Sequence, residues 1–407
     1  MQTVPPGWLP DPGTEPEAVI REARRRQRRR WLAAGVAIVT VAAGAAAVIA
    51  GYASGGRPRP PGRHATAAPK PVPSSMSGLP VPAGSTVRLL LTGRRPAWFW
   101  TATRRTEPIK GLPWNRAGYA FNRLVGGWSV QPYPAGPGCL PTCAGPPLPN
   151  YIIADGSPRA ARIGHGFWIS ASDGSGTVWL TTFRRSADNV GATSARAQEV
   201  TTAGRAAGPG FRLPAGYGIQ RAVGGDLLLA PDSEGPGTVR YKLWDPGTRH
   251  VAGTFRDVIA ASPQQIAWPV CVYCPVHVLN LLTGTTATIP IPRGTWASNN
   301  GTFSPDGRFL AFLLSAGAAE RFGVQTRIAV IDIATRRLLA VPGTTLSGAA
   351  AQRLSFGWQA NGHRLIAVLP RPGQTIQVAS WQPGAAHLWV ATARIPRGAS
   401  AVLGEYG

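Results

Sequence analysis

The sequence is poor in acidic residues and in lysine. Only 18 of the 407 residues are Asp or Glu, against 42 Lys and Arg, and the lysines are Lys70, Lys110 and Lys242 alone. Glycosidase-type and metal-dependent sites need several carboxylates that converge on one point, so the supply for them is thin. Some of the carboxylates present, such as Asp155 and Asp306, precede glycine in turns. Hydrogen bonds between these side chains and the backbone are a sufficient structural explanation for their presence.

Motifs of the common enzyme classes are missing as well. The sequence contains no GxSxG elbow, no HExxH pair and no phosphate-binding glycine loop. From these absences we expect no catalytic residue, no metal ligand and no cofactor, and we expect a protein that is not an enzyme.

Charge is also missing from one long apolar run. Residues 31–53, from Trp31 to Ala53, carry no charge, and a helix of about 1.5 Å per residue over this length spans a hydrocarbon core of ~30 Å. The cluster REARRRQRRR directly before it predicts a cytoplasmic N-terminus. We therefore expect residues 1–30 to be a basic cytoplasmic tail and residues 31–53 a single transmembrane helix in the cell membrane. A cleaved signal peptide, cut near Gly51–Ala53, is the alternative, although the run and its head are long for one.

The chain beyond the apolar run divides into a linker and a large domain. Residues 54–83 include RPRPPGR and APKPVPSS and predict an extended, Pro-rich tether. Residues 84–407 alternate short strands and turns, without helical periodicity, and should form an extracytoplasmic domain. The bias towards Arg, Ala and Gly is typical of a GC-rich, for example actinobacterial, genome.

Excess positive charge bears on the partners of this domain. From Ser54 onward there are 35 basic and 14 acidic residues, which favours an anionic envelope polymer, phospholipid heads or an acidic protein. Solubility combined with an Arg-rich composition explains the same excess equally well. Nucleic acid is not an expected partner, because topology control and lipid contact already explain the basic tail.

A turn motif recurs in residues 84–407. FSPDGRFLAF, residues 303–312, sets a tight turn before an apolar strand, and WQANGHRLIAV, residues 358–368, repeats it with Asn-Gly in place of Asp-Gly. The residues of this blade-turn motif are Ser304, Pro305, Asp306, Gly307, Asn361 and Gly362. YAFNRLVGGWSVQ, residues 119–131, and YGIQRAVGGDLLL, residues 217–229, share Tyr, Arg, Val and two Gly at equal offsets. Such spacing indicates a repeated sheet unit.

FSPDGRFLAF resembles a strand hairpin of TolB-type and WD-repeat-like β-propellers, and RIAVIDIATRRLLAVPG, residues 327–343, resembles the next two strands of the same blade. The resemblance implies an all-β propeller, a fold used mostly as a binding platform and in a minority of cases by enzymes. With the turns as the register, six units follow one another, and a seventh takes three strands from residues 87–112 and one from residues 401–406. We expect seven blades, with six as the alternative, closed by strands from both ends.

The four cysteines form two close pairs, Cys139 with Cys143 and Cys271 with Cys274. Outside the membrane they should be oxidised, so we expect structural disulfides that each staple one blade loop. A four-cysteine zinc site and, at Cys271 and Cys274, a redox CxxC are the alternatives.

Three residues are candidates for a site on the propeller axis: His165, Asp226 and His363. We take the turns as outer-to-inner connections, so the strands that start near these residues should be innermost. The leading function is a non-catalytic, membrane-anchored platform that binds a protein or ligand at the cell envelope. The alternative is an extracytoplasmic hydrolase or lyase with its site on the axis.

Overall fold

A computed structural model provides the structure of the chain. It describes residues 79–80, 87–101, 103–115, 118–124, 127–132, 148–155, 157–166, 168–171, 177–185, 192–231, 240–298, 301–316, 325–347, 354–359, 361–371, 374–396 and 399–406. The predicted tail, span and most of the tether lie outside the described residues. Within these ranges, no helix has the length and apolar character needed to cross a membrane.

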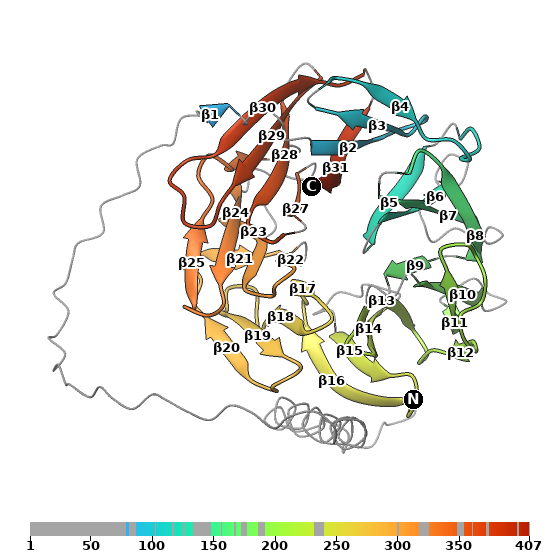
Figure 1. The fold of residues 1–407 in the computed structure, drawn as a ribbon. Coiled ribbons are helices and arrows are strands. Elements are labelled where there is room, and N and C mark those ends of the chain that lie inside the picture. The colour runs from blue at the N-terminus through green and yellow to red at the C-terminus, as the bar shows by residue number, and fades with distance from the viewer. Residues whose placement is uncertain are drawn as a thin grey trace, which may run out of the picture.

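The described strands form seven blades arranged in a ring (Figure 1). From the innermost strand outward, blade 1 contains β31 (Ser400–Tyr406), β2 (Val87–Thr92), β3 (Ala97–Trp100) and β4 (Thr106–Pro108). Blade 2 contains β5 (Tyr119–Leu124), β6 (Gly127–Pro132), β7 (Leu148–Ala154) and β8 (Ala160–Gly166). Blade 3 contains β9 (Trp168–Ala171), β10 (Thr177–Arg185), β11 (Ala192–Thr201) and β12 (Phe211–Arg212).

The remaining four blades follow in chain order. Blade 4 contains β13 (Tyr217–Val223), β14 (Asp226–Pro231), β15 (Arg240–Asp245) and β16 (His250–Arg256). Blade 5 contains β17 (Ala260–Ala261), β18 (Gln265–Pro269), β19 (Val276–Asn280) and β20 (Thr286–Ile289). Blade 6 contains β22 (Thr302–Phe303), β23 (Phe309–Ala316), β24 (Gln325–Asp332) and β25 (Arg337–Ala340), with β21 (Thr295–Ala297) and β26 (Leu346–Ser347) added. Blade 7 contains β27 (Ser355–Trp358), β28 (Leu365–Arg371), β29 (Thr375–Trp381) and β30 (Trp389–Arg394), with β1 (Leu79–Pro80) along β30.

Blade 1 closes the ring with strands from both ends of the domain. β31 pairs antiparallel with β2, so that Val402 lies opposite Leu90. The pairing removes the exposed edge that an open first blade would leave. The expected seven-bladed, all-β propeller with this closure is confirmed, and the six-bladed alternative is excluded.

The register of the blades differs from the expected one. The recurring turns join the innermost strand to the second strand, as β22 leads to β23 and β27 to β28 (Figure 1). The strands after Asp226, Arg308 and His363 are therefore second strands, and the expectation that they are innermost was wrong. In blades 5 and 6 the reason is length, since β17 and β22 have only two residues each and carry no readable alternation. In blades 4 and 7 the innermost strands are longer, and the turn residues alone do not show which of the two strands they join lies inside.

Each blade buries both faces of its middle strands against its two neighbours. Ala311 and Leu313 of β23 pack towards blade 7, whereas Leu310, Phe312 and Leu314 pack towards blade 5. Successive side chains of a strand point to opposite faces, so a strand buried on both sides reads as one continuous apolar run. Seven such clusters, one at each boundary between blades, make up the core.

A second kind of turn recurs between the third and fourth strands. Asp245, Asn280 and Asp332 each accept hydrogen bonds from the backbone N–H groups two and three residues further on. A threonine stands three residues after each of them, and the next residue has a positive φ, 57° at Arg249, 70° at Gly284 and 55° at Arg336. The side-chain oxygen replaces a backbone acceptor and holds the tight reversal in place.

Candidate functional site

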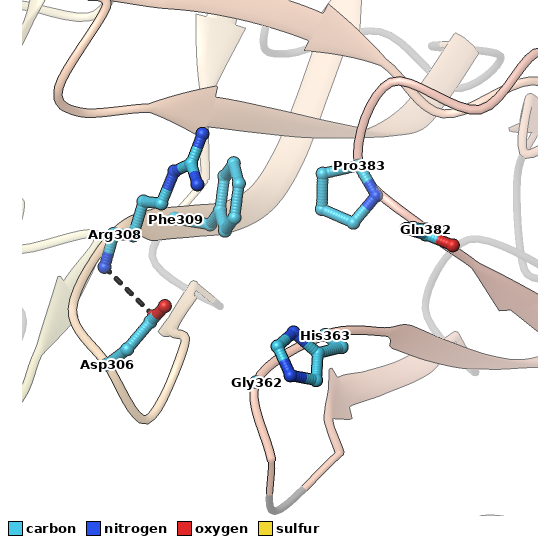
Figure 2. Close-up of a pocket in the computed structure, with 7 residues that line it drawn as sticks. All are labelled: Asp306, Arg308, Phe309, Gly362, His363, Gln382 and Pro383. Carbon is cyan, nitrogen blue, oxygen red and sulfur yellow. Dashed lines mark hydrogen bonds between the residues drawn. The ribbon is translucent and has the colours of Figure 1, made fainter.

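A hollow of about 210 Å³ lies between blades 6 and 7, at the edge where the blade turns gather (Figure 2). Its lining residues are Asp306, Arg308, Phe309, Gly362, His363, Gln382 and Pro383. They come from three turns, β22–β23, β27–β28 and β29–β30. Figure 2 shows the rings of Phe309 and Pro383 on opposite sides of the hollow, with His363 between the two blade turns.

The first wall is the Ser304–Gly307 turn. Gly307 N–H donates to the Ser304 carbonyl at 2.8 Å, and the Ser304 hydroxyl donates to the Asp306 carboxylate at 2.5 Å. Arg308 N–H donates to the same carboxylate oxygen at 3.1 Å. Gly307 has a φ of 71°, a conformation that side chains with a Cβ rarely adopt. Thus the Asp306 carboxylate is engaged in building the turn.

The second wall repeats this construction. Gly362 N–H donates to the Gln359 carbonyl at 2.8 Å, and His363 N–H donates to Asn361 Oδ1 at 3.0 Å. A Cβ on Gly362 would lie 3.6 Å from Pro305 Cδ, so the two blade turns lie next to each other with room for about one methyl group between them. Two turns of the same design therefore form neighbouring walls of the hollow between blades 6 and 7.

Two stacked aromatic rings and an ion-paired arginine complete the site. The Arg308 guanidinium lies 4.8 Å from the centre of the Phe309 ring, which stacks on Trp358 with ring centres 5.6 Å apart. The Trp358 indole N–H donates to the Thr302 carbonyl and ties blade 7 to blade 6. Arg308 also forms an ion pair with Asp332 at 3.4 Å. Both acidic groups near the hollow are thus engaged, one in the turn and one with Arg308.

This arrangement combines apolar contact surface with a few polar groups. His363 and Gln382 are exposed and carry polar atoms at the rim, while Phe309 and Pro383 present apolar faces. Such a combination suits the docking of a side chain or small ligand between an apolar wall and a few hydrogen-bonding groups.

The three residues expected near the axis lie on three blades that are not neighbours. His363 is in the hollow just described, and Asp226 begins β14 of blade 4. His165 lies on the outermost strand of blade 2, where its ring contacts the Arg162 guanidinium. The structure does not bring these three residues into one site.

One of the two cysteine pairs is described. Cys271 and Cys274 form a disulfide in the β18–β19 loop, so this pair is not half of a zinc site. Val270, Val272 and Tyr273 of the same loop are about half exposed. Cys139 and Cys143 lie outside the described residues. Across the described ranges, no group of three or more His, Cys, Asp or Glu side chains is placed to hold a metal ion.

Titratable groups with shifted pKa values lie elsewhere in the ring. Burial lowers the pKa of Arg221 on β13, and burial also lowers the pKa of His277, whose ring stacks on Trp268 with centres 5.5 Å apart. Burial raises the pKa of Asp257, against the opposing effect of Arg256. Arg221 belongs to the repeated segment of residues 217–229, but neither it nor Asp257 was predicted as a site residue from the sequence.

Comparison with known proteins bears on the fold alone. No protein-family model matches the sequence, and no curated protein matches it. TolB from Acinetobacter baumannii has a similar structure, with a TM-score of 0.43 at 10% identity over 81% of this chain and 68% of that one. The periplasmic gluconolactonase of Pseudomonas aeruginosa gives a TM-score of 0.46 at 12% identity, over 79% of this chain and 97% of that one.

A third similar structure is a 6-phosphogluconolactonase-like protein, described as putative, from Bacteroides fragilis. Its TM-score is 0.39 at 12% identity, over 79% of this chain and 99% of that one. The strand order of the chain itself defines the class of protein, a seven-bladed β-propeller. At these identities, the activities named for the similar proteins are not assigned to this chain.

Proposed function

We propose that this protein is a non-catalytic binding platform, with the hollow between blades 6 and 7 as a contact site for a protein or ligand. The observation that carries the proposal is the state of the charged groups there. Asp306 is held by Ser304 and by the Arg308 backbone, and Asp332 is held by Arg308. The rim then carries one imidazole, His363, one carboxamide, Gln382, and two ring faces, and the lining offers no second uncommitted titratable group to pair with His363 as acid and base.

The platform would work at the outer face of the cell membrane. The proposal rests here on the sequence, since the uncharged run of residues 31–53 and the Arg cluster before it predict an anchor with the propeller outside. The excess of 35 basic over 14 acidic residues from Ser54 onward favours an anionic polymer or an acidic protein surface as the partner.

A quantitative pull-down of the full chain from its native membranes tests the proposal. We expect discrete partners that stay bound at high salt, and we expect His363→Ala to lower their recovery on the order of tenfold, equivalent to ~1.4 kcal/mol of lost contact. His250→Ala, at an exposed histidine of blade 4, is the matched control and should leave recovery unchanged.

Two outcomes would count against the platform at this hollow. Equal recovery with His363→Ala and with wild type would remove the hollow from the contact surface. Binding that disappears as salt is raised would reduce the interaction to unspecific charge attraction. In either case a hydrolase or lyase on the axis becomes the function to screen.

A further inference from the structure

Arg221 lies on the innermost strand of blade 4, beside an irregularity in the pairing of that strand. Ile219 pairs with Leu229 and Arg221 with Leu228, so Gln220 is left without a residue opposite in β14. A bulge of this kind bends the strand and re-aims the side chains next to it. Arg221 also forms a parallel pair with Ala171 of β9, which joins the innermost strands of blades 3 and 4.

The Arg221 side chain is enclosed by protein but still reachable. Its guanidinium donates a hydrogen bond to the Ala261 carbonyl of β17, across the boundary with blade 5. Protein atoms surround the group closely enough for burial to lower its pKa, yet the residue keeps part of its surface open to solvent. The charge is therefore largely desolvated, while the residue as a whole still borders solvent.

No negative group compensates this charge in the part of the chain that the structure describes. There, the Ala261 carbonyl is the one hydrogen-bond or ionic partner of the Arg221 side chain. A guanidinium has five N–H donors, and one carbonyl leaves most of them unused. Because burying an unpaired charge is costly, this arrangement calls for an explanation beyond packing.

A purely structural role, as a hydrogen bond that connects blades 4 and 5, does not explain the buried charge of Arg221. The same boundary is already packed by Val223 and Leu228 from blade 4 and by Ala261 and Ile266 from blade 5. A neutral amide donor could bond the carbonyl without desolvating a charge. The hydrogen bond to Ala261 accounts for one N–H donor of Arg221. It does not account for the positive charge or for the remaining N–H donors.

We propose that Arg221 anchors an anion-binding site at the inner wall of the ring, for a small ligand bearing a carboxylate or a phosphate. The planar guanidinium fork can hold two oxygens of such a group at once. The formal net charge of +24 raises the local concentration of anions around the whole chain. This site is separate from the hollow between blades 6 and 7 and does not depend on the function proposed for it.

Thermal unfolding of the full chain with added anions tests the site. Inorganic phosphate and acetate are titrated separately, with chloride keeping the ionic strength constant. The melting temperature should rise and saturate with at least one of them, and the anion that saturates at the lower concentration identifies the headgroup. Arg221→Gln should abolish the saturable shift, and Arg221→Lys, which keeps the charge but loses the fork, should need roughly tenfold more anion.

Arg240→Gln is the matched control, because Arg240 is an exposed arginine of the same blade, and its shift should equal that of wild type. The same shift in Arg221→Gln and wild type, or no saturable shift with either anion, would overturn the proposal. Arg221→Met adds a readout without ligand. The proposal predicts that its melting temperature in anion-free buffer is not lower than that of wild type, whereas a purely structural role predicts a decrease.

Discussion

The Arg308 side of the ring and the Arg221 side place the same residue type in opposite situations. Arg308 lies over Phe309, is 57% exposed at its side chain, and pairs with Asp332. Arg221 is enclosed at the inner wall, and among the described residues its side chain meets a single carbonyl. The two arginines therefore differ in charge compensation more than in exposure, since Arg308 has a carboxylate partner and Arg221 has none within the described ranges.

The largest expected effect comes from opening the ring that holds both regions. Deleting residues 400–407 removes β31 together with its core residues Ala401 and Leu403, exposes the edge of β2 and leaves a gap in the core between blades 7 and 1. We expect loss of cooperative unfolding, since the cost of such a core deletion, ~3–5 kcal/mol, is a large part of a domain's stability. Circular dichroism melts measure it. Deletion of Gly407 alone is the control, and a two-state melt of the larger deletion would contradict the closure.

The next effect separates backbone strain from crowding at the boundary between blades 4 and 5. Gly224 has a φ of 60°, and a Cβ there would lie 2.9 Å from the Pro263 carbonyl oxygen. Gly216 has a φ of 73° and nothing within 4 Å of such a Cβ. Gly216→Ala should lose ~1 kcal/mol from strain, and Gly224→Ala ~2–4 kcal/mol, because the backbone must also shift. Equal losses of unfolding free energy in urea would show that the β13–β14 turn at Gly224 does not touch the β17–β18 turn at Pro263.

Asp332 both forms the ion pair with Arg308 and holds the turn between β24 and β25. Asp332→Ala removes the acceptor for Ala334 N–H and Thr335 N–H as well as the partner of Arg308, so we expect a loss of ~1–3 kcal/mol. Arg308→Met removes only a largely exposed ion pair, and its loss should stay within ~1 kcal/mol. Urea unfolding of both variants gives the order, and a larger loss for Arg308→Met would mean that the ion pair, not the turn, matters.

The smallest effect is the pH dependence near His277. Burial lowers the pKa of this imidazole, so below its ordinary value of about 6.5 the unfolded chain binds a proton more readily than the folded one. Stability should therefore decrease as the pH falls from 7.5 to 5.5, and the decrease should be smaller in His277→Gln. The difference between the two urea curves is the measurement, and an identical pH dependence would show that other groups cause it.

Much of the fold could be predicted, because the second strands are long and apolar and the turns carry Asp-Gly, Asn-Gly or Gly-Gly. The innermost strands could not, since two residues such as Thr302–Phe303 show no period. The third-to-fourth strand turns at Asp245, Asn280 and Asp332 share a threonine three residues on. That repeat was present in the sequence and would have given a better register.

The candidate sites were less accessible to sequence reasoning. Among the residues that line the hollow, Asp306 and Gly362 belong to the recurring turn motif and His363 follows it, whereas Gln382 and Pro383 come from a turn without a signature. Arg221 belongs to the repeat YGIQRAVGG, which has Arg123 at the same offset in the first copy. The repeat marks the position, but whether a charge has a partner depends on strands that are distant in sequence.

Hydrogen exchange measured along a phosphate titration of the full chain tests the comparison most directly. The account predicts saturable protection of the segments around Arg221 and Ala261, with no change in the Ser304–Phe309 and Gln359–Arg364 turns. Protection of the two blade turns, with the inner wall unchanged, would contradict it and place the free cation at Arg308 instead.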